Sequence, residues 1–216
     1  MPTDRIETVR RIEESGLIAV IRADDQNQAL DVCKALRDGG VTVWEIAMTT
    51  PGALRAIERA AEEFGQDGVL GVGTVLDSQT AVAAIHAGAD FVFSPITDLG
   101  VIEVAHRYGR VVVPGALTPT EIATAWSAGA DMVKVFPANH FGPSYFKDIR
   151  GPLPQVKLTP TGGVTLETVP DWIQAGAAAL GVGSSMVKKD LIRNGDWRGL
   201  TELASKFVDA VRVARG

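Results

Sequence analysis

A chain of 216 residues with 46% hydrophobic and 22% charged residues is long enough to bury a substantial core, and its composition is ordinary for a globular protein. The formal net charge of −5 and the lack of a dense Lys/Arg block argue against a nucleic-acid-binding surface. No apolar run has the length of a membrane span, and residues 1–15 are rich in charge, unlike a signal peptide. We therefore expect a cytoplasmic protein that binds neither nucleic acid nor membranes.

Apolar, strand-like runs alternate with helical segments along the whole chain. Residues 1–15 are predicted to form an extra helix, with Thr3 as a candidate N-cap. The expected strands follow it in order: Leu17–Arg22, Val41–Met48, Val69–Thr74, Asp90–Ser94, Val111–Gly115, Asp131–Phe136, Val156–Thr161 and Ala179–Ser184. Amphipathic or alanine-rich segments, such as Pro51–Phe64 and Gln79–Ala87, fill most of the gaps. This α/β alternation predicts parallel strands and a single (β/α)8 TIM barrel over residues 1–216, with a doubly wound open sheet as the alternative.

A short motif recurs where helices are expected to end. His86–Asp90 reads His-Ala-Gly-Ala-Asp, and Ser127–Asp131 and Gln174–Ala178 are close variants, with Asp38–Val41 as a looser one. In each copy a glycine can supply the left-handed residue that ends a helix before the next strand. The repeat therefore predicts the same helix-to-strand corner in several units of one fold.

Lys134 lies within Asp131–Phe136, a stretch that otherwise has the pattern of a buried strand. Lysine is almost never fully buried without a partner, and burial favours its neutral amine. A neutral amine in a dry pocket is a nucleophile that forms Schiff bases with carbonyl compounds. The alternative is a lysine that ends its strand and reaches solvent.

Glu45 is predicted to face the barrel interior together with Val41 and Val43, by strand alternation. Its carboxylate and the Lys134 amine form either a proton shuttle beside a nucleophile or a buried structural salt bridge. Because an ionised carboxylate opposes deprotonation of the lysine, we expect Glu45 to stand back by a water's width or to be partly protonated.

Polar residues and glycines collect at the carboxyl ends of the expected strands, where barrels of this class build their active sites. Gly162 and Gly163 follow the seventh strand, and Gly183 and Ser184 end the eighth. These two loops form the common phosphate site of such barrels, although two tight turns without a ligand are the alternative. The three histidines are scattered, so no metal site is predicted.

Several motifs, in this order along the chain, resemble one family. They are Val43–Ile46, Gly71–Val75, Phe93–Pro95, Val113–Gly115, Val133–Ala138, Pro160–Val164 and Gly181–Ser184. The chain resembles the 2-keto-3-deoxy-6-phosphogluconate (KDPG) and 4-hydroxy-2-oxoglutarate (KHG) aldolases from about Leu17 to Val187. The resemblance implies a class I aldolase on a (β/α)8 barrel, a lyase that uses a lysine Schiff base and needs neither a metal nor another cofactor.

The resemblance also implies roles for individual residues. Lys134 corresponds to the Schiff-base lysine and Glu45 to the general acid/base. Thr74 and Thr161 correspond to residues near the keto-acid carboxylate and carbonyl, and Pro95 and Phe136 to apolar contacts. Gly162, Gly163, Gly183 and Ser184 correspond to the phosphate pocket.

The partners implied are small molecules, and the assembly implied is a homotrimer. The expected reaction cleaves KDPG reversibly into pyruvate and glyceraldehyde 3-phosphate. KHG or a galactonate-type acid is the alternative substrate. Two further alternatives for the function are a phosphosugar isomerase or epimerase barrel and a non-catalytic scaffold.

One position departs from the family pattern. Many members have arginine four residues after the catalytic glutamate, where this chain has Thr49. Arg22, at the end of the first expected strand, can supply a guanidinium for the substrate carboxylate instead.

Overall fold

The computed structural model describes residues 4–65 and 67–216. The candidate cap Thr3 lies outside them; helix α1 follows Asp4, whose side chain makes no capping hydrogen bond. The helices are α1 (Arg5–Ser15), α2 (Gln26–Asp38), α3 (Ala53–Phe64), α4 (Ser78–His86), α5 (Leu99–Arg107), α6 (Pro119–Ser127), α7 (Gly142–Arg150), α8 (Val169–Gln174), α9 (Lys189–Arg193) and α10 (Trp197–Arg215), with 3-10 turns η1 (Ala138–His140) and η2 (Leu166–Thr168). The strands are β1 (Leu17–Ile21), β2 (Val43–Ala47), β3 (Val69–Gly73), β4 (Phe91–Phe93), β5 (Val111–Val113), β6 (Gly115–Ala116), β7 (Val133–Val135), β8 (Leu158–Pro160) and β9 (Leu180–Val182).

The strands form a closed parallel barrel. One sheet has the order β5-β4-β3-β2-β1-β9 and the other the order β6-β7-β8. Pro114 separates β5 from β6, because proline has no amide hydrogen for a sheet ladder, so the expected strand Val111–Gly115 is split there. On the opposite side a parallel bridge between Thr161 and Gly181 joins β8 to β9. The predicted (β/α)8 barrel is confirmed, and the open-sheet alternative is wrong.

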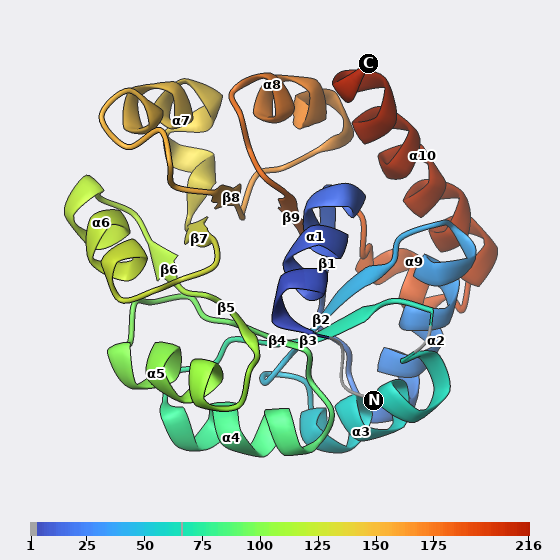
Figure 1. The fold of residues 1–216 in the computed structure, drawn as a ribbon. Coiled ribbons are helices and arrows are strands. Elements are labelled where there is room, and N and C mark those ends of the chain that lie inside the picture. The colour runs from blue at the N-terminus through green and yellow to red at the C-terminus, as the bar shows by residue number, and fades with distance from the viewer. Residues whose placement is uncertain (1–3, 66) are drawn as a thin grey trace.

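Helices surround this ring of strands, and α1 crosses one end of it (Figure 1). Left-handed glycines end the segments before four strands, as the recurring motif predicts: Gly40, Gly88, Gly129 and Gly176.

The barrel has a core on each side of its strands. Outward side chains such as Trp44 and Val72 pack with the helices. Inward side chains, among them Val43, Phe91 and Met132, fill the interior. This alternation confirms that Val43, beside Glu45, and Met132, beside Lys134, point inward. The prediction for Val41 is wrong: it lies before the start of β2, outside the strand alternation, and packs in the outer core.

Helix α1 closes the amino-terminal end of the barrel, which we call the base. Its Ile12 is fully buried in the interior core. Arg5 pairs with Asp131 at 2.8 Å, and Glu13 pairs with Lys157 at 2.9 Å. Arg215, in the last turn of α10, donates hydrogen bonds of 2.7 Å to the carbonyl oxygens of Glu13 and Glu14. The base is therefore fastened by ion pairs and by the end of α10.

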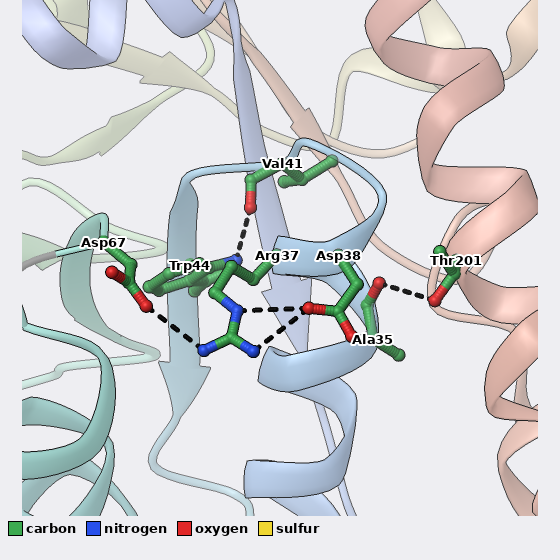
Figure 2. A network of polar contacts seen from close by, with 7 residues as sticks. All are labelled: Ala35, Arg37, Asp38, Val41, Trp44, Asp67 and Thr201. Carbon is green, nitrogen blue, oxygen red and sulfur yellow. Dashed lines mark hydrogen bonds and ion pairs between the residues drawn. The ribbon is translucent and has the colours of Figure 1, made fainter.

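The outward face of β2 is fixed by a polar network (Figure 2). The Trp44 indole donates to the carbonyl oxygen of Val41 at 2.8 Å, and Arg37 pairs with Asp38 and Asp67. Thr201 of α10 donates to the carbonyl oxygen of Ala35 in α2. Since Trp44 is held outside, its neighbour Glu45 must point inside. Within the described part of the chain, no helix combines the length and the apolar character needed to cross a membrane.

Candidate active site

Lys134 lies at the middle of β7, with only 3% of its surface exposed. Its amide donates to the carbonyl oxygen of Pro114, and it is in register with Gly115 and Thr159 on the neighbouring strands. Burial lowers the pKa of the Lys134 ammonium, against the opposing attraction of Glu45. The structure thus places inside the barrel a lysine whose burial favours the neutral amine. The alternative, a lysine that reaches solvent, is wrong.

Glu45 is fully buried on β2. Within residues 4–65 and 67–216, neither of its carboxylate oxygens has a hydrogen-bond partner. Burial raises the pKa of Glu45 to about 7, while the positive charges of Lys134 and Arg22 act in the opposite direction. The carboxyl group is thus near Lys134 without being hydrogen-bonded to it, which does not fit a structural salt bridge and fits the expected partly protonated state.

Gly73 on β3 provides the space for the Glu45 carboxyl group. A Cβ atom at position 73 would lie 1.4 Å from Oε1 of Glu45, so any side chain there would force the carboxyl group or the strand to shift. The requirement for glycine here is a close approach of side chain to backbone, because Gly73 itself has no left-handed φ.

A cavity of about 240 Å³ opens at the carboxyl end of the strands. It brings together these residues that the sequence predicts for the site: Arg22, Lys134, Phe136, Thr161, Gly162, Gly163, Gly183 and Ser184. Val20, Val164, Thr165, Gly181 and Ser185 complete the wall. Glu45 is buried away from this wall, and Thr49, Thr74 and Pro95 do not line it.

Thr161 presents an unpaired hydroxyl group at this wall. Its Oγ1 is buried and has no hydrogen-bond partner among the described residues. Gly181 makes room for it, since a Cβ there would lie 2.2 Å from Oγ1. Unsatisfied buried polar atoms are rare in folded proteins, so this hydroxyl is available to a ligand oxygen.

The two glycine loops lie side by side in the wall of the cavity. Gly162 and Gly163 have φ of +94° and +77°, a conformation that L residues rarely adopt. Ser185 Oγ donates to the carbonyl oxygen of Val164 at 2.5 Å and so ties the loop after β9 to the loop after β8. Arg22 and Lys134 are the charged side chains among the described residues of the wall, which favours an anionic ligand.

Thr74 has φ of +60°, the only positive φ of a non-glycine residue in the described ranges. A β-branched residue in this region is strained, and such strain is concentrated at functional sites. Thr74 comes directly after Gly73, the last residue of β3. The strained backbone is therefore next to the glycine that makes room for the Glu45 carboxyl group.

Sequence reasoning missed two residues at this site, Gly73 and Phe93. Phe93 is fully buried on β4, and Nζ of Lys134 lies 4.2 Å from the centre of its ring. Both residues belong to motifs that the family resemblance rests on, but their contacts depend on how the barrel closes. No three His, Cys, Asp or Glu side chains group as a metal site in residues 4–65 and 67–216, and independence from metals stays a prediction.

Comparison with known proteins gives a consistent family assignment. The model of the KDPG and KHG aldolase family matches residues 8–203. The chain is 36% identical over 200 residues to 2-dehydro-3-deoxy-6-phosphogalactonate aldolase of Escherichia coli, covering 92% of this chain and 95% of that protein. It is 34% identical to 2-dehydro-3-deoxy-phosphogluconate aldolase of Pseudomonas aeruginosa, over 96% of this chain and 93% of that one.

Among solved structures, the KDPG aldolase of Legionella pneumophila, with pyruvate captured as a covalent carbinolamine, superposes with a TM-score of 0.83 at 30% identity, covering 92% of this chain and 96% of that one. The matches cover more than nine tenths of this chain and of each matched protein. This chain therefore belongs to the KDPG and KHG aldolase family.

Proposed function

We propose that this aldolase cleaves KDPG reversibly into pyruvate and glyceraldehyde 3-phosphate through a Schiff base on Lys134. The observation that carries the proposal is a buried lysine, pushed toward its neutral form, at the wall of a cavity that ends in two glycine loops. Imine chemistry needs a neutral amine as the nucleophile and a nearby group that transfers protons, and Lys134 and Glu45 provide the two.

The first half of the reaction forms the imine. The lone pair of the Lys134 amine attacks C2 of the keto acid. The attacking nitrogen loses one proton and the carbonyl oxygen takes one up, which gives a neutral carbinolamine. A second proton lets the hydroxyl group leave as water, and the nitrogen becomes a protonated imine. Arg22 lines the same wall and supplies a bidentate partner for the substrate carboxylate.

The second half breaks the carbon chain. Glu45 takes the proton of the C4 hydroxyl, the aldehyde leaves, and the electrons of the C3–C4 bond flow into the protonated imine to give an enamine. Glu45 then returns the proton to C3, and water releases pyruvate from Lys134. A pKa of about 7 suits a group that must both accept and return a proton near neutrality.

The glycine loops support a phosphorylated substrate. Consecutive left-handed glycines let the backbone approach a phosphate closely, and the serine of the neighbouring loop adds a hydroxyl donor. The Zymomonas mobilis KDPG aldolase, 28% identical to this chain, has been solved with 3-phosphoglycerate. The galactonate-type isomer and KHG remain the alternative substrates, since relatives of both kinds match this chain.

Borohydride trapping with pyruvate tests the proposal. We expect a stable adduct that peptide mass analysis places on Lys134, and none in Lys134→Ala. The absence of any adduct on folded protein would instead favour a phosphosugar isomerase barrel or a non-catalytic scaffold. The values of kcat/KM for KDPG, its galactonate isomer and KHG then rank the substrates; equal values for phosphorylated and unphosphorylated acids would contradict the phosphate site.

We also propose that residues 1–216 form one domain, that it acts in the cytoplasm, and that it assembles as a homotrimer. The side chains of Leu76, Ile96 and Leu99, each about half exposed in the loops after β3 and β4 and at the start of α5, support self-association. Light scattering of the purified protein measures its mass in solution; a monomer would contradict the trimer.

A further inference from the structure

The nitrogen of Lys134 lies against two aromatic rings. Nζ is 4.2 Å from the ring centre of Phe93 and 4.9 Å from that of Phe136. Both distances fall within the range in which a ring face attracts a cation. Phe93 is fully buried beneath the site, whereas Phe136 is 36% exposed at the mouth.

Phe93 is held in place from below. Its ring meets the ring of Phe91 edge to face, with 6.4 Å between centres and an interplanar angle of 81°. Phe91 in turn occupies the space above Gly71, where a Cβ would lie 2.3 Å from its ring. The two rings therefore form an edge-to-face pair, and Phe93 cannot move away from Lys134 without disturbing the interior core.

The charged groups around Lys134 provide only weak compensation for a cation. Glu45 faces it from β2, and Arg22 faces it from the end of β1. Glu45 is partly neutral near pH 7, and Arg22 repels a positive charge. The protonated imine, by contrast, carries a positive charge on this nitrogen from its formation until the electrons of the C3–C4 bond neutralise it as the enamine.

We propose that Phe93 is a catalytic residue whose ring face, together with that of Phe136, stabilises the positive charge of the protonated imine on Lys134. Phe91 acts through Phe93 and is a positioning residue. The inference rests on the proposed Schiff-base function. It adds to that function a residue that acts through the face of its aromatic ring and has no polar side-chain atom.

The inference predicts a specific pH dependence. Below the pKa of Lys134, imine formation exchanges one cation, the ammonium, for another, so the ring contributes nothing to pyruvate affinity. Above that pKa a neutral amine becomes a cation, and the ring contributes in full. Removing the ring face therefore lowers affinity only in the alkaline range and moves the break in the profile to lower pH. Water entering a looser site would move the break the other way, because it would relieve the desolvation that lowers the pKa.

The experiment measures the fraction of Lys134 trapped by a borohydride reagent as pyruvate is increased, between pH 5 and pH 10. It compares wild type, Phe93→Leu and Phe93→pentafluorophenylalanine, which keeps an aromatic ring of similar shape but reverses the sign of its quadrupole. We expect alkaline affinity to fall about 3- to 30-fold in both variants, as for a desolvated cation–π contact. The fluorinated variant carries the test if Phe93→Leu does not fold.

Phe64→Leu is the matched control. Phe64 is equally buried, meets Trp44 edge to face and lies 5.2 Å from the Arg37 guanidinium, but it is on the outer side of the barrel. Its loss should leave the profile unchanged. An unchanged profile in the Phe93 variants, or a break that moves to higher pH, overturns the inference while leaving the Schiff base intact. A wild-type protein that forms no adduct overturns the proposed function and the inference with it.

Discussion

Gly73 and Glu45 approach so closely across neighbouring strands that a Cβ on the glycine would lie 1.4 Å from Oε1 of the carboxyl group. Because Gly73 on β3 has no side chain, there is space beside it for the Glu45 carboxyl group inside the barrel. Gly73→Ala must push the carboxyl group away or distort β3.

We expect Gly73→Ala to destabilise the fold by about 1–3 kcal/mol, as overpacked cores do. We also expect kcat to fall by about a hundredfold, the usual effect of displacing a catalytic group by an ångström. Urea denaturation and steady-state kinetics measure the two effects. Gly151→Ala, whose added Cβ would meet its nearest neighbour at an ordinary 3.4 Å, is the control. Full activity in Gly73→Ala would show that the glutamate's position is not critical.

The buried carboxyl group of Glu45 should make stability depend on pH. Its pKa is about 7 in the folded protein, against 4.5 for the unperturbed group, so the folded state binds this proton more tightly. The contribution is complete below pH 4.5 and is lost as pH rises to about 7, a change of about 3 kcal/mol. Glu45→Gln has no such proton, so its stability relative to wild type should improve between pH 5 and pH 8.

Urea denaturation of both proteins at the two pH values measures this difference. Glu58→Gln, on an exposed position of α3, controls for the loss of a carboxylate. Parallel pH profiles for wild type and Glu45→Gln would mean that Glu45 is not buried as a neutral acid.

Arg22 should substitute for the arginine that the family pattern has at position 49. Arg22 lines the cavity, while Thr49 is exposed and does not. We expect Arg22→Gln to lower kcat/KM by about 10- to 100-fold, the effect of losing a charged hydrogen bond. Thr49→Arg in that background should recover part of the loss. Kinetics with Arg55→Gln, an exposed arginine of α3, serve as the control. If the double variant shows no recovery, position 49 does not reach the substrate carboxylate in this chain.

Ser184 should discriminate phosphorylated from unphosphorylated acids. It is exposed at the end of the cavity beside Gly183, so removing its hydroxyl group should not disturb packing. We expect Ser184→Ala to reduce kcat/KM for KDPG by about tenfold or more, because a hydrogen bond to a charged oxygen is lost, and to leave KHG unaffected. Ser205→Ala, on the exposed side of α10, is the control. Equal losses with both acids would place Ser184 in a general rather than a phosphate-specific role.

The sequence was sufficient to predict the barrel and the inward direction of Glu45 and Lys134, because both follow from local patterns. Apolar runs determine the strands, and strand alternation determines the faces. Contacts across the barrel could not be predicted in the same way. Phe93 reaches Lys134 from a strand about forty residues earlier, and that contact depends on closure and on the curvature of the strands.

The close contacts between glycines and side chains of neighbouring strands could not be predicted from the sequence either. The motif Gly71–Thr74 is conspicuous, but only the side-chain contacts in the folded barrel show that Gly71 makes room for Phe91 of β4 and Gly73 for Glu45. The register alone pairs Glu45 with Gly71. The unbroken strand expected over Val111–Gly115 was wrong: Pro114 interrupts it between β5 and β6, and the apolar run before the proline concealed that break.

The hydrogen bonds of Arg215 to the end of α1 have a practical consequence for handling this enzyme. They hold the last turn of α10 at the base, where α1 also lies, so the described ends of the chain are on the side away from the cavity. A tag, a surface linker or a fused partner attached at either of them would extend away from the mouth. Immobilised through these ends, the barrel would present its substrate entrance to the solution.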